Sequence, residues 1–547
     1  MKTKWLKHKI KYIGSAMLYF CSGGTPQKVR MSYEKINNYY KIAVILNKKF
    51  NITMDKFLYY LSEKINKFGE NSKERNEIKK QWIQVFNSSP DDMKMFVYQM
   101  MYFTGIYDAD ITKLLVKYAN ETPISEYRYW LTMDLGVMTF RYQNAIYNGY
   151  FSQRKKLLKT IAEESDIKIP TISLSQREDV YQKICIVTYY LSPDELNSAR
   201  RVAELMANGL ARNGKDVYIV NLNAFMGSDG LITINPLEIT LTQIKLINDK
   251  FDKNVKIDHM CDKNYRARFQ NAIEKIYEYA PDIILDLTDE YSPIASIYNK
   301  DFCTIYKPFR SLGTSAYFYK VLIGGGKETY KELNEKYNFI DLNDVIEWNM
   351  PEYMPQRKKK INRSEITVNE DDYIIITIGN NDFYINDELS DCMAKLLNSE
   401  NIVWLLVGRK APKYIHEKYK KLIERKKIIE WGFEDDLLSL CDVCNISLRP
   451  DMKGGSGGTA IAAKAGLPIV MTKFVCDPMR WLGKDYTNND NYNDCITEIK
   501  HLIHDKVYYD QQKNRTLECI NSAIDSPEKW RELVKTLELI KGEYDER

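Results

Sequence analysis

A basic, glycine-rich loop that leads into a helix is the stretch of this sequence best suited to chemistry. Residues 448–471 are LRPDMKGGSGGTAIAAKAGLPIVM, so Arg449 and Lys453 bring positive charge to the loop. Its glycines let the backbone approach a ligand closely; they are Gly454, Gly455, Gly457 and Gly458. We expect Thr459 to begin the helix, so that the first N–H groups and the positive end of the helix dipole face the loop. Residues 450–458, here named the glycine loop, therefore predict an anion site that suits a diphosphate.

The glycine loop matches neither of two common nucleotide-binding patterns. It is not the GxxxxGK[ST] loop of ATPases, nor the GxGxxG turn of dinucleotide enzymes, so neither class is indicated. The alternative is a glycine-rich turn that binds nothing. We favour a ligand site because the basic residues, the loop, the helix start and the following strand GLPIVM occur together.

The segments around the glycine loop predict an open parallel sheet. Short apolar runs alternate with helical patterns from residue 371 onward, which is typical of an α/β domain. The expected strands lie within residues 371–384, 401–410, 426–433, 441–450 and 466–472. In open parallel sheets ligands bind outside the carboxyl ends of the strands. The glycine loop follows one of these ends.

Another α/β pattern precedes this one. Residues 183–191 (KICIVTYYL) and 215–223 (KDVYIVNLN) indicate strands, and residues 192–214 between them indicate a helix. A strand–helix–strand unit of this length predicts parallel strands joined by a right-handed crossover. Further strands are expected in PDIILDLTDE and DFCTIYKPF.

The first part of the chain has helical spacing instead. In DKFLYYLSEKINKF (55–68) apolar residues recur every three or four positions. The predicted fold class is therefore α/β, with two Rossmann-like domains preceded by an all-helical domain, and 547 residues suit about three domains. The expected boundaries are 1–170 for the helical domain, 178–345 for the first Rossmann-like domain, 346–370 for a basic linker and 371–547 for the second Rossmann-like domain with C-terminal helices.

Composition narrows the functional class of the protein and its cellular compartment. The 79 basic and 74 acidic residues nearly balance, which does not favour a nucleic-acid binder. Ten scattered cysteines favour reduced thiols in a cytoplasmic protein. In the basic, then apolar segment 1–21, the apolar part runs only from Ile13 to Cys21, which is well short of the ~20 apolar residues that span a bilayer. Three interpretations of this segment stay open: a plain helix or tail, peripheral contact with an anionic membrane surface, and an export signal.

Residues 370–475 resemble the GT-B glycosyltransferases. In many bacterial members, of the glycosyltransferase group 1 type, a strand ending in Pro leads to a Lys-Gly-Gly-Thr-like loop, a helix and Gly-x-Pro-Val-Val. The matching residues here are Pro450, Lys453, Gly454, Gly455, Gly458, Thr459 and 466–470. The upstream run KKIIEWGFEDDLLSLCDVCNISLRP is similar to the family as well. Over 180–345 the resemblance is architectural, and it does not cover the helical domain.

The resemblance implies a donor site for a nucleotide sugar. Trp431 and Gly432, beside Glu430, would border the nucleotide base, and Arg409 and Lys410 would lie near the diphosphate. The loop after the first strand of this domain contributes Gly379, Asn380 and Asn381. With the glycine loop, the implied donor set is Gly379, Asn380, Arg409, Lys410, Trp431, Gly432, Arg449, Lys453, Gly454, Gly455, Gly457, Gly458 and Thr459.

One position departs from the family. Many retaining members carry a Glu that holds the nucleotide ribose where this chain has Ile461. A retaining reaction is therefore not implied, and a lineage without catalysis stays open.

The implied reaction is transfer of a sugar, from a UDP-sugar, to a protein or glycan acceptor. Basic side chains and helix N–H groups would stabilise the leaving phosphate without a metal or cofactor. An inverting reaction needs a base from the first α/β domain. The candidates are Asp194, Asp289 and Glu290, with His259 as another, and each is also suited to a structural role.

A helical domain ahead of a GT-B pair resembles protein-modifying glycosyltransferases, which slightly favours a protein acceptor. Two other functions stay open at this point. One is a non-catalytic GT-B-like subunit that binds a partner glycosyltransferase or an adhesin, and the other is a nucleotide-sugar epimerase. The type of sugar, hexosyl or N-acetylhexosaminyl, is not indicated.

Overall fold

The computed structural model describes residues 73–89, 94, 97–98, 101, 108–123, 126–141, 145–170, 182–193, 197–224, 239–288, 293–307, 320–323, 327, 331, 334–335, 341–366, 369, 371–379, 381–452, 455–474 and 478–547. The basic segment 1–21 and the helix predicted within 55–68 lie outside these residues. The described residues form two compact units: one includes those up to Ser165 with Asn264–Arg266, and the other includes the rest from Asp166 onward.

The first unit is helical, as the sequence predicts. Its long helices are α4 (Lys73–Ser88), α6 (Ala109–Glu121), α7 (Glu126–Arg141) and α8 (Tyr150–Glu164). Asp108 caps the N-terminus of helix α6, and its carboxylate accepts hydrogen bonds from the N–H groups of Asp110 and Ile111. Lys79 of α4 pairs with Asp108 at 2.5 Å and Asp110 at 2.7 Å. This pairing joins the start of α6 to α4.

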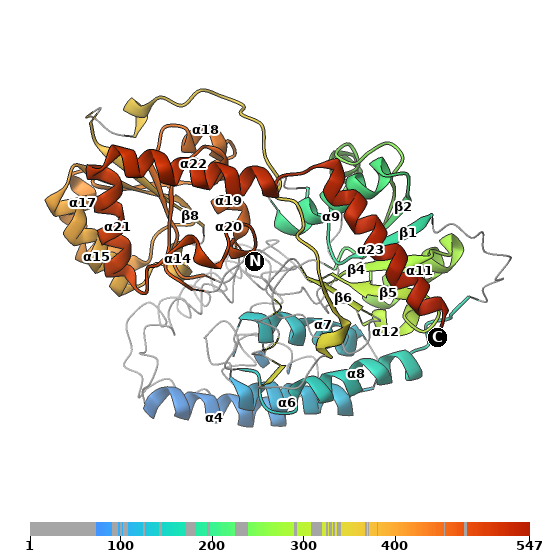
Figure 1. Ribbon diagram of the computed structural model, residues 1–547. Helices are drawn as coiled ribbons and strands as arrows, with labels where there is room; N and C mark the ends of the chain where they lie inside the picture. The colour runs from blue at the N-terminus through green and yellow to red at the C-terminus, as the bar shows by residue number, and fades with distance from the viewer. Residues whose placement is uncertain are drawn as a thin grey trace, which may run out of the picture. The chain divides into compact units, whose positions relative to one another are not determined.

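The second unit contains two parallel sheets (Figure 1). The first has seven strands in the order β3-β2-β1-β4-β5-β6-β7. Its strands are β1 (Lys183–Thr188), β2 (Asp216–Asn221), β3 (Lys256–His259), β4 (Ile283–Leu287), β5 (Cys303–Tyr306), β6 (Lys320–Ile323) and β7 (Val345–Glu347). Its helices are α9 (Ser198–Arg212), α10 (Leu241–Asn248), α11 (Tyr265–Tyr279) and α12 (Ala295–Tyr298). The strand order reverses beside β1, as in doubly wound folds.

The second sheet has the order β10-β9-β8-β11-β12. Its strands are β8 (Tyr373–Gly379), β9 (Ile402–Gly408), β10 (Ile428–Gly432), β11 (Ile446–Leu448) and β12 (Ile469–Val470). Its helices are α14 (Asn381–Tyr384), α15 (Asp387–Ser399), α16 (Lys413–Lys418), α17 (Lys420–Glu424), α18 (Leu437–Cys441), α19 (Ser456–Lys464), α20 (Met479–Leu482), α21 (Tyr492–His504) and α22 (Lys506–Ala523). Successive strand residues face opposite cores: Ile374 and Ile376 lie in one apolar cluster and Ile375 in another.

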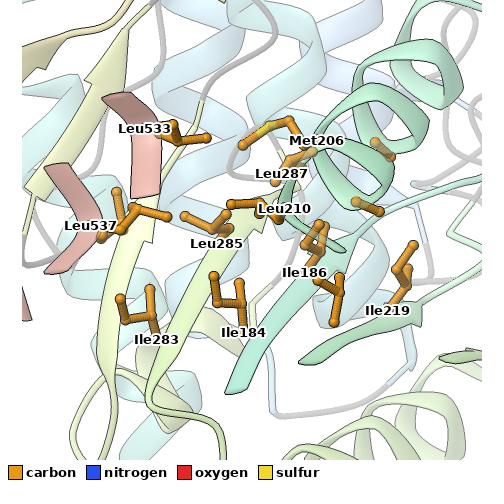
Figure 2. Close-up of a cluster of buried hydrophobic side chains, with 14 of the residues drawn as sticks. Ile184, Ile186, Met206, Leu210, Ile219, Ile283, Leu285, Leu287, Leu533 and Leu537 are labelled. Carbon is orange, nitrogen blue, oxygen red and sulfur yellow. The ribbon is translucent and has the colours of Figure 1, made fainter. Parts of the chain in front are cut away.

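The last helix, α23 (Pro527–Asp545), packs on the first sheet. Figure 2 shows Leu533 and Leu537 beside Ile283 and Leu285 of β4. Trp530 lies so close to Gly209 of α9 that a Cβ on Gly209 would be 2.2 Å from its ring. The predicted second domain, 371–547, includes this helix, whereas its buried side chains belong to the core of the first sheet.

The basic linker is held to the second sheet's loops by ion pairs. Arg357 donates two hydrogen bonds to Asp442, at 2.6 and 2.8 Å. Lys359 lies 2.9 Å from Glu434. Two linker N–H groups, those of Lys358 and Lys359, donate to Asp436.

Within the described residues, no helix is long and apolar enough to cross a lipid bilayer.

Candidate functional site

Three glycines end neighbouring strands of the second sheet. Gly379, Gly408 and Gly432 close β8, β9 and β10 with φ angles of 147°, 110° and 82°. A Cβ on Gly408 would lie 2.3 Å from the carbonyl oxygen of Gly379, a distance that no side chain tolerates. Gly379 and Gly432, which are predicted donor-site residues, therefore lie at the carboxyl edge of the sheet, where neighbouring backbones approach closely.

The glycine loop leads into α19 earlier than expected. Helix α19 begins at Ser456 rather than Thr459, after Gly455 with φ of 86°. Gly458 lies in the first turn against Ile378 of β8, and a Cβ on it would be 2.8 Å from that side chain. Gly457 faces open space: apart from its own residue, its two chain neighbours and the backbone of its own helix, no atom of the described residues lies within 4 Å of the position of its Cβ. The helix thus starts close to β8, and the place where a side chain of residue 457 would lie is open.

Arg449 organises the glycine loop from inside. Its side chain is only 4% exposed. The guanidinium donates to the carbonyl oxygen of Met452 at 2.8 Å, to Oγ1 of Thr459 at 3.1 Å and to the carbonyl oxygen of Gly455 at 3.4 Å. The structure therefore brings Arg449 and Thr459 together, and these contacts fix the shape of the loop.

The loop after β9 is fixed from two sides. Asn381 donates to the carbonyl oxygen of Arg409 at 2.9 Å. Glu430 accepts the N–H of Ala411 at 2.6 Å and lies 3.3 Å from His416. Arg409 and Lys410 are exposed between these anchors. Both predicted basic residues thus sit at the carboxyl edge of the sheet.

Trp431, on β10, is oriented by Glu434. Its indole Nε1 donates to Glu434 at 3.0 Å, and the same carboxylate accepts the N–H of Asp436. Burial alone would raise the pKa of Glu434, but hydrogen bonds from Asp436, Lys359 and Trp431 outweigh it and lower the pKa to about 2. The carboxylate is therefore ionised and able to hold the indole at neutral pH.

The strand order sets the span of this edge. β10 lies three strand spacings from β11, which leads to the glycine loop. At the usual spacing this is about 14 Å. The residues on β10 that are predicted to border the base and the glycine loop after β11 thus lie along one edge of the sheet.

Six predicted site residues lie outside the described part of the chain: Asp194, Asp289, Glu290, Asn380, Lys453 and Gly454. Their roles stay predictions. Among the described residues, no group of three or more His, Cys, Asp or Glu side chains could hold a metal ion.

His259 ends β3 at the carboxyl edge of the first sheet, with both ring nitrogens engaged. Asn221 Nδ2 donates to Nδ1 at 2.9 Å, and Nε2 lies 2.9 Å from Asn248 Oδ1, which can only accept. Burial lowers the pKa of His259 to about 4, against an opposing effect of Asp258. The ring is therefore neutral and hydrogen-bonded, which favours the structural role for this residue.

We expect His259→Gln to flatten the acid dependence of stability. The unfolded chain binds a proton at His259 near pH 6.5, whereas the folded chain does so only near pH 4. The neutral His259 ring therefore contributes to the free energy of unfolding above pH 6.5, and this contribution is lost as the pH falls toward 4. Urea unfolding at pH 7 and pH 4.5 should show the wild type losing about 2 kcal/mol more than the variant. Exposed His501→Gln is the control, and equal losses in wild type and His259→Gln would contradict the assignment.

A buried network that the sequence did not reveal adjoins the glycine loop. Oγ of Ser456 donates to Glu352 at 2.5 Å and accepts from Nε1 of Trp481 at 3.1 Å. Arg480 also donates to Glu352. Ser456 lies in the conspicuous run GGSGG, but Glu352 and Arg480 are far from it in sequence and carry no motif.

Comparisons with known proteins identify the fold. No family model matches the chain. A mutant of the O-GlcNAc transferase of Thermobaculum terrenum is similar over 97% of both chains, with a TM-score of 0.51 and 11% identity. Anabaena Alr3699/HepE, solved in complex with UDP and glucose, aligns with 65% of this chain and 99% of its own, with a TM-score of 0.44 and 11% identity.

The first likeness shows the GT-B fold, with two Rossmann-like domains. One curated protein also matches by sequence. It is the vacuolar protein sorting/targeting protein 10 of Lodderomyces elongisporus, 25% identical over 166 residues. That match spans 30% of this chain and 11% of the relative's length.

Proposed function

We propose that the chain is a glycosyltransferase that moves a sugar from a nucleotide-diphosphate sugar, a UDP-sugar, to a protein or glycan acceptor. The observation that carries the proposal is the open space beside Gly457 at the start of α19, on the carboxyl edge of a Rossmann-like sheet. Helix N-termini with glycine-rich approaches bind phosphate groups. The GT-B fold places this chain among folds that host such transfer, which is support by analogy.

In the proposed reaction, a nucleophilic atom of the acceptor bonds to the anomeric carbon while the bond from that carbon to the β-phosphate oxygen breaks. The nucleoside diphosphate leaves with the bonding electrons, and the acceptor's proton passes to a base. Arg409, Lys410, Lys453 and the first N–H groups of α19 would stabilise the charge that develops on the leaving group. No metal is needed for this role. Asp194, Asp289 and Glu290 remain the predicted bases.

One observation favours a second function. Ile461, at the position where many retaining family members carry a ribose-binding Glu, is 4% exposed and lies in an apolar core of the second sheet. The site therefore offers no carboxylate at that position. A non-catalytic subunit that binds a partner glycosyltransferase or an adhesin would need none.

A binding screen separates the two functions. Purified protein is titrated with UDP-, GDP-, ADP- and CMP-sugars in a calorimeter, and donor hydrolysis is followed for each. Binding together with turnover of one nucleotide sugar supports the transferase. If no nucleotide sugar binds or turns over, the transferase proposal is wrong and the non-catalytic subunit is favoured.

Lys453→Ala should weaken donor binding by about 1.5–3 kcal/mol, because a charged hydrogen bond to the diphosphate would be lost. Calorimetric titration with the donor identified in the screen measures the change. Lys464→Ala is the matched control, since Lys464 is at the opposite end of α19 and contacts Asn521. Equal affinities of wild type and Lys453→Ala would remove Lys453 from the site.

A further inference from the structure

Glu352 is a buried acid in the linker between the two sheets. It is 6% exposed, and its N–H donates to the carbonyl oxygen of Ala523 at 2.8 Å. The next residue, Tyr353, lies under Arg201 of α9, with the guanidinium carbon 4.7 Å from the ring centroid. Two neighbouring linker residues thus contact the two halves of this unit. Tyr353 contacts helix α9 of the first sheet, and Glu352 contacts helices that cover the second sheet.

The carboxylate of Glu352 contacts the first residue of α19. One oxygen, Oε1, accepts from Oγ of Ser456 at 2.5 Å and also from Arg480. Trp481 donates to the same hydroxyl at 3.1 Å, so the Ser456 side chain has both a donor and an acceptor. The orientation of the first turn of α19 is therefore tied to a residue of the linker.

The charges around Glu352 do not make this place negative. Burial lowers the pKa of Lys529, the charge of Arg480 lowers it further, and Glu352 opposes both effects, so these three groups lie near one another. Glu532 opposes them as well, so the group consists of two cations and two carboxylates. Its charges balance, and Arg480 offsets the carboxylate of Glu352 beside the start of α19.

Packing alone does not hold Glu352. A cavity of about 270 Å³ borders it and is also lined by Glu204 and Arg212 of α9 and by Lys464 of α19. Because tight packing is absent on that side, the hydrogen bonds to Ser456 and Arg480 must orient the carboxylate.

We propose that Glu352 is a positioning residue for the donor site. It holds Ser456, and through it the first turn of α19, in the orientation that presents N–H groups to the diphosphate, and it keeps Arg480 beside that turn. The inference rests on the proposed function, because it requires a diphosphate at this helix start.

UDP is the probe, and its dissociation constant is measured by calorimetry. Glu352→Ala should raise the dissociation constant at least about tenfold, which is about 1.4 kcal/mol. Glu352→Gln should bind nearly as wild type, because its amide oxygen can accept from Ser456 and Arg480. Glu204→Ala is the matched control: Glu204 lines the same cavity, and its carboxylate lies 4.0 Å from Arg200 of its own helix. A merely structural role would lower the melting temperature of Glu352→Ala without changing the dissociation constant.

If Glu352→Ala fails to fold, Ser456→Ala serves in its place and should show the same tenfold weakening. Unchanged UDP affinity in the folded variants would overturn the inference while leaving the proposed function intact. Equal weakening in Glu352→Gln and Glu352→Ala would also overturn it, since charge rather than the hydrogen bond would then matter. A wild-type protein that binds no nucleotide at all would overturn the proposed function, and the inference with it.

Discussion

Arg449→Met should abolish measurable UDP binding and lower the free energy of unfolding by about 3–4 kcal/mol. Methionine has a similar length but no donor, so the carbonyl oxygen of Met452 and the hydroxyl of Thr459 would lose their buried partner. A charged donor to such groups contributes about 1.5–3 kcal/mol for each hydrogen bond. The glycine loop would then lose the shape that leaves space beside Gly457. We expect UDP affinity to fall at least about a hundredfold.

Two further variants sharpen this test. Arg449→Lys keeps the charge but not the planar fork, so it should recover only part of the loss in calorimetry and urea unfolding. Arg357→Met is the matched control, because Arg357 also makes two hydrogen bonds yet its side chain is 54% exposed. Its ion pair should contribute no more than about 1 kcal/mol. Wild-type UDP affinity in Arg449→Met would show that the loop keeps its shape without the guanidinium.

Trp530→Ala should destabilise the first sheet by about 3–5 kcal/mol, in the range of large buried aromatic side chains. Trp530 on α23 is 2% exposed and packs against Gly209, where a Cβ would collide with the indole ring. Its indole donates to Asp525, and its ring lies 5.4 Å from that of Trp348. Removal would leave a cavity between α23 and α9 and weaken the attachment of the helix.

Differential scanning calorimetry measures this effect as a lowered transition temperature. Leu539→Ala on the same helix is the control, since Leu539 is 71% exposed and should change stability by less than about 0.5 kcal/mol. UDP affinity at a temperature where both variants are folded should match that of the wild type. An unchanged transition in Trp530→Ala would mean that α23 contributes little to the core of the first sheet.

The sequence predicted those parts of the fold whose signals are local. Apolar runs such as KICIVTYYL gave β1, and the strand, glycines, helix and strand at 448–471 are adjacent in the chain. β3 was missed because Lys256–His259 is short and only half-buried, so it lacks an apolar run. The start of α19 was placed too late because glycines are poor helix formers, yet Gly457 and Gly458 lie within this helix. A Cβ on Gly458 would lie 2.8 Å from Ile378, so the close approach to β8 requires a glycine there.

The rest of the site depends on contacts between distant residues. Glu352 meets Ser456 across 104 positions and Arg480 across 128. Neither partner belongs to a pattern of spacing, so only the folded chain reveals the network. The same holds for Arg449. The sequence shows its charge, but only the structure shows that its guanidinium donates hydrogen bonds within the glycine loop.

The return of α23 to the first sheet affects the order of events during synthesis on the ribosome. Ile283 and Leu285 of β4 leave the ribosome long before Leu533 and Leu537, the residues that cover them. The whole second sheet is made in between, which at about 5–20 residues per second takes on the order of ten seconds or more. During that interval an apolar face of the first sheet is uncovered in the nascent chain. Chaperones that bind apolar surface should therefore associate with ribosome-bound chains of this protein until α23 emerges and docks.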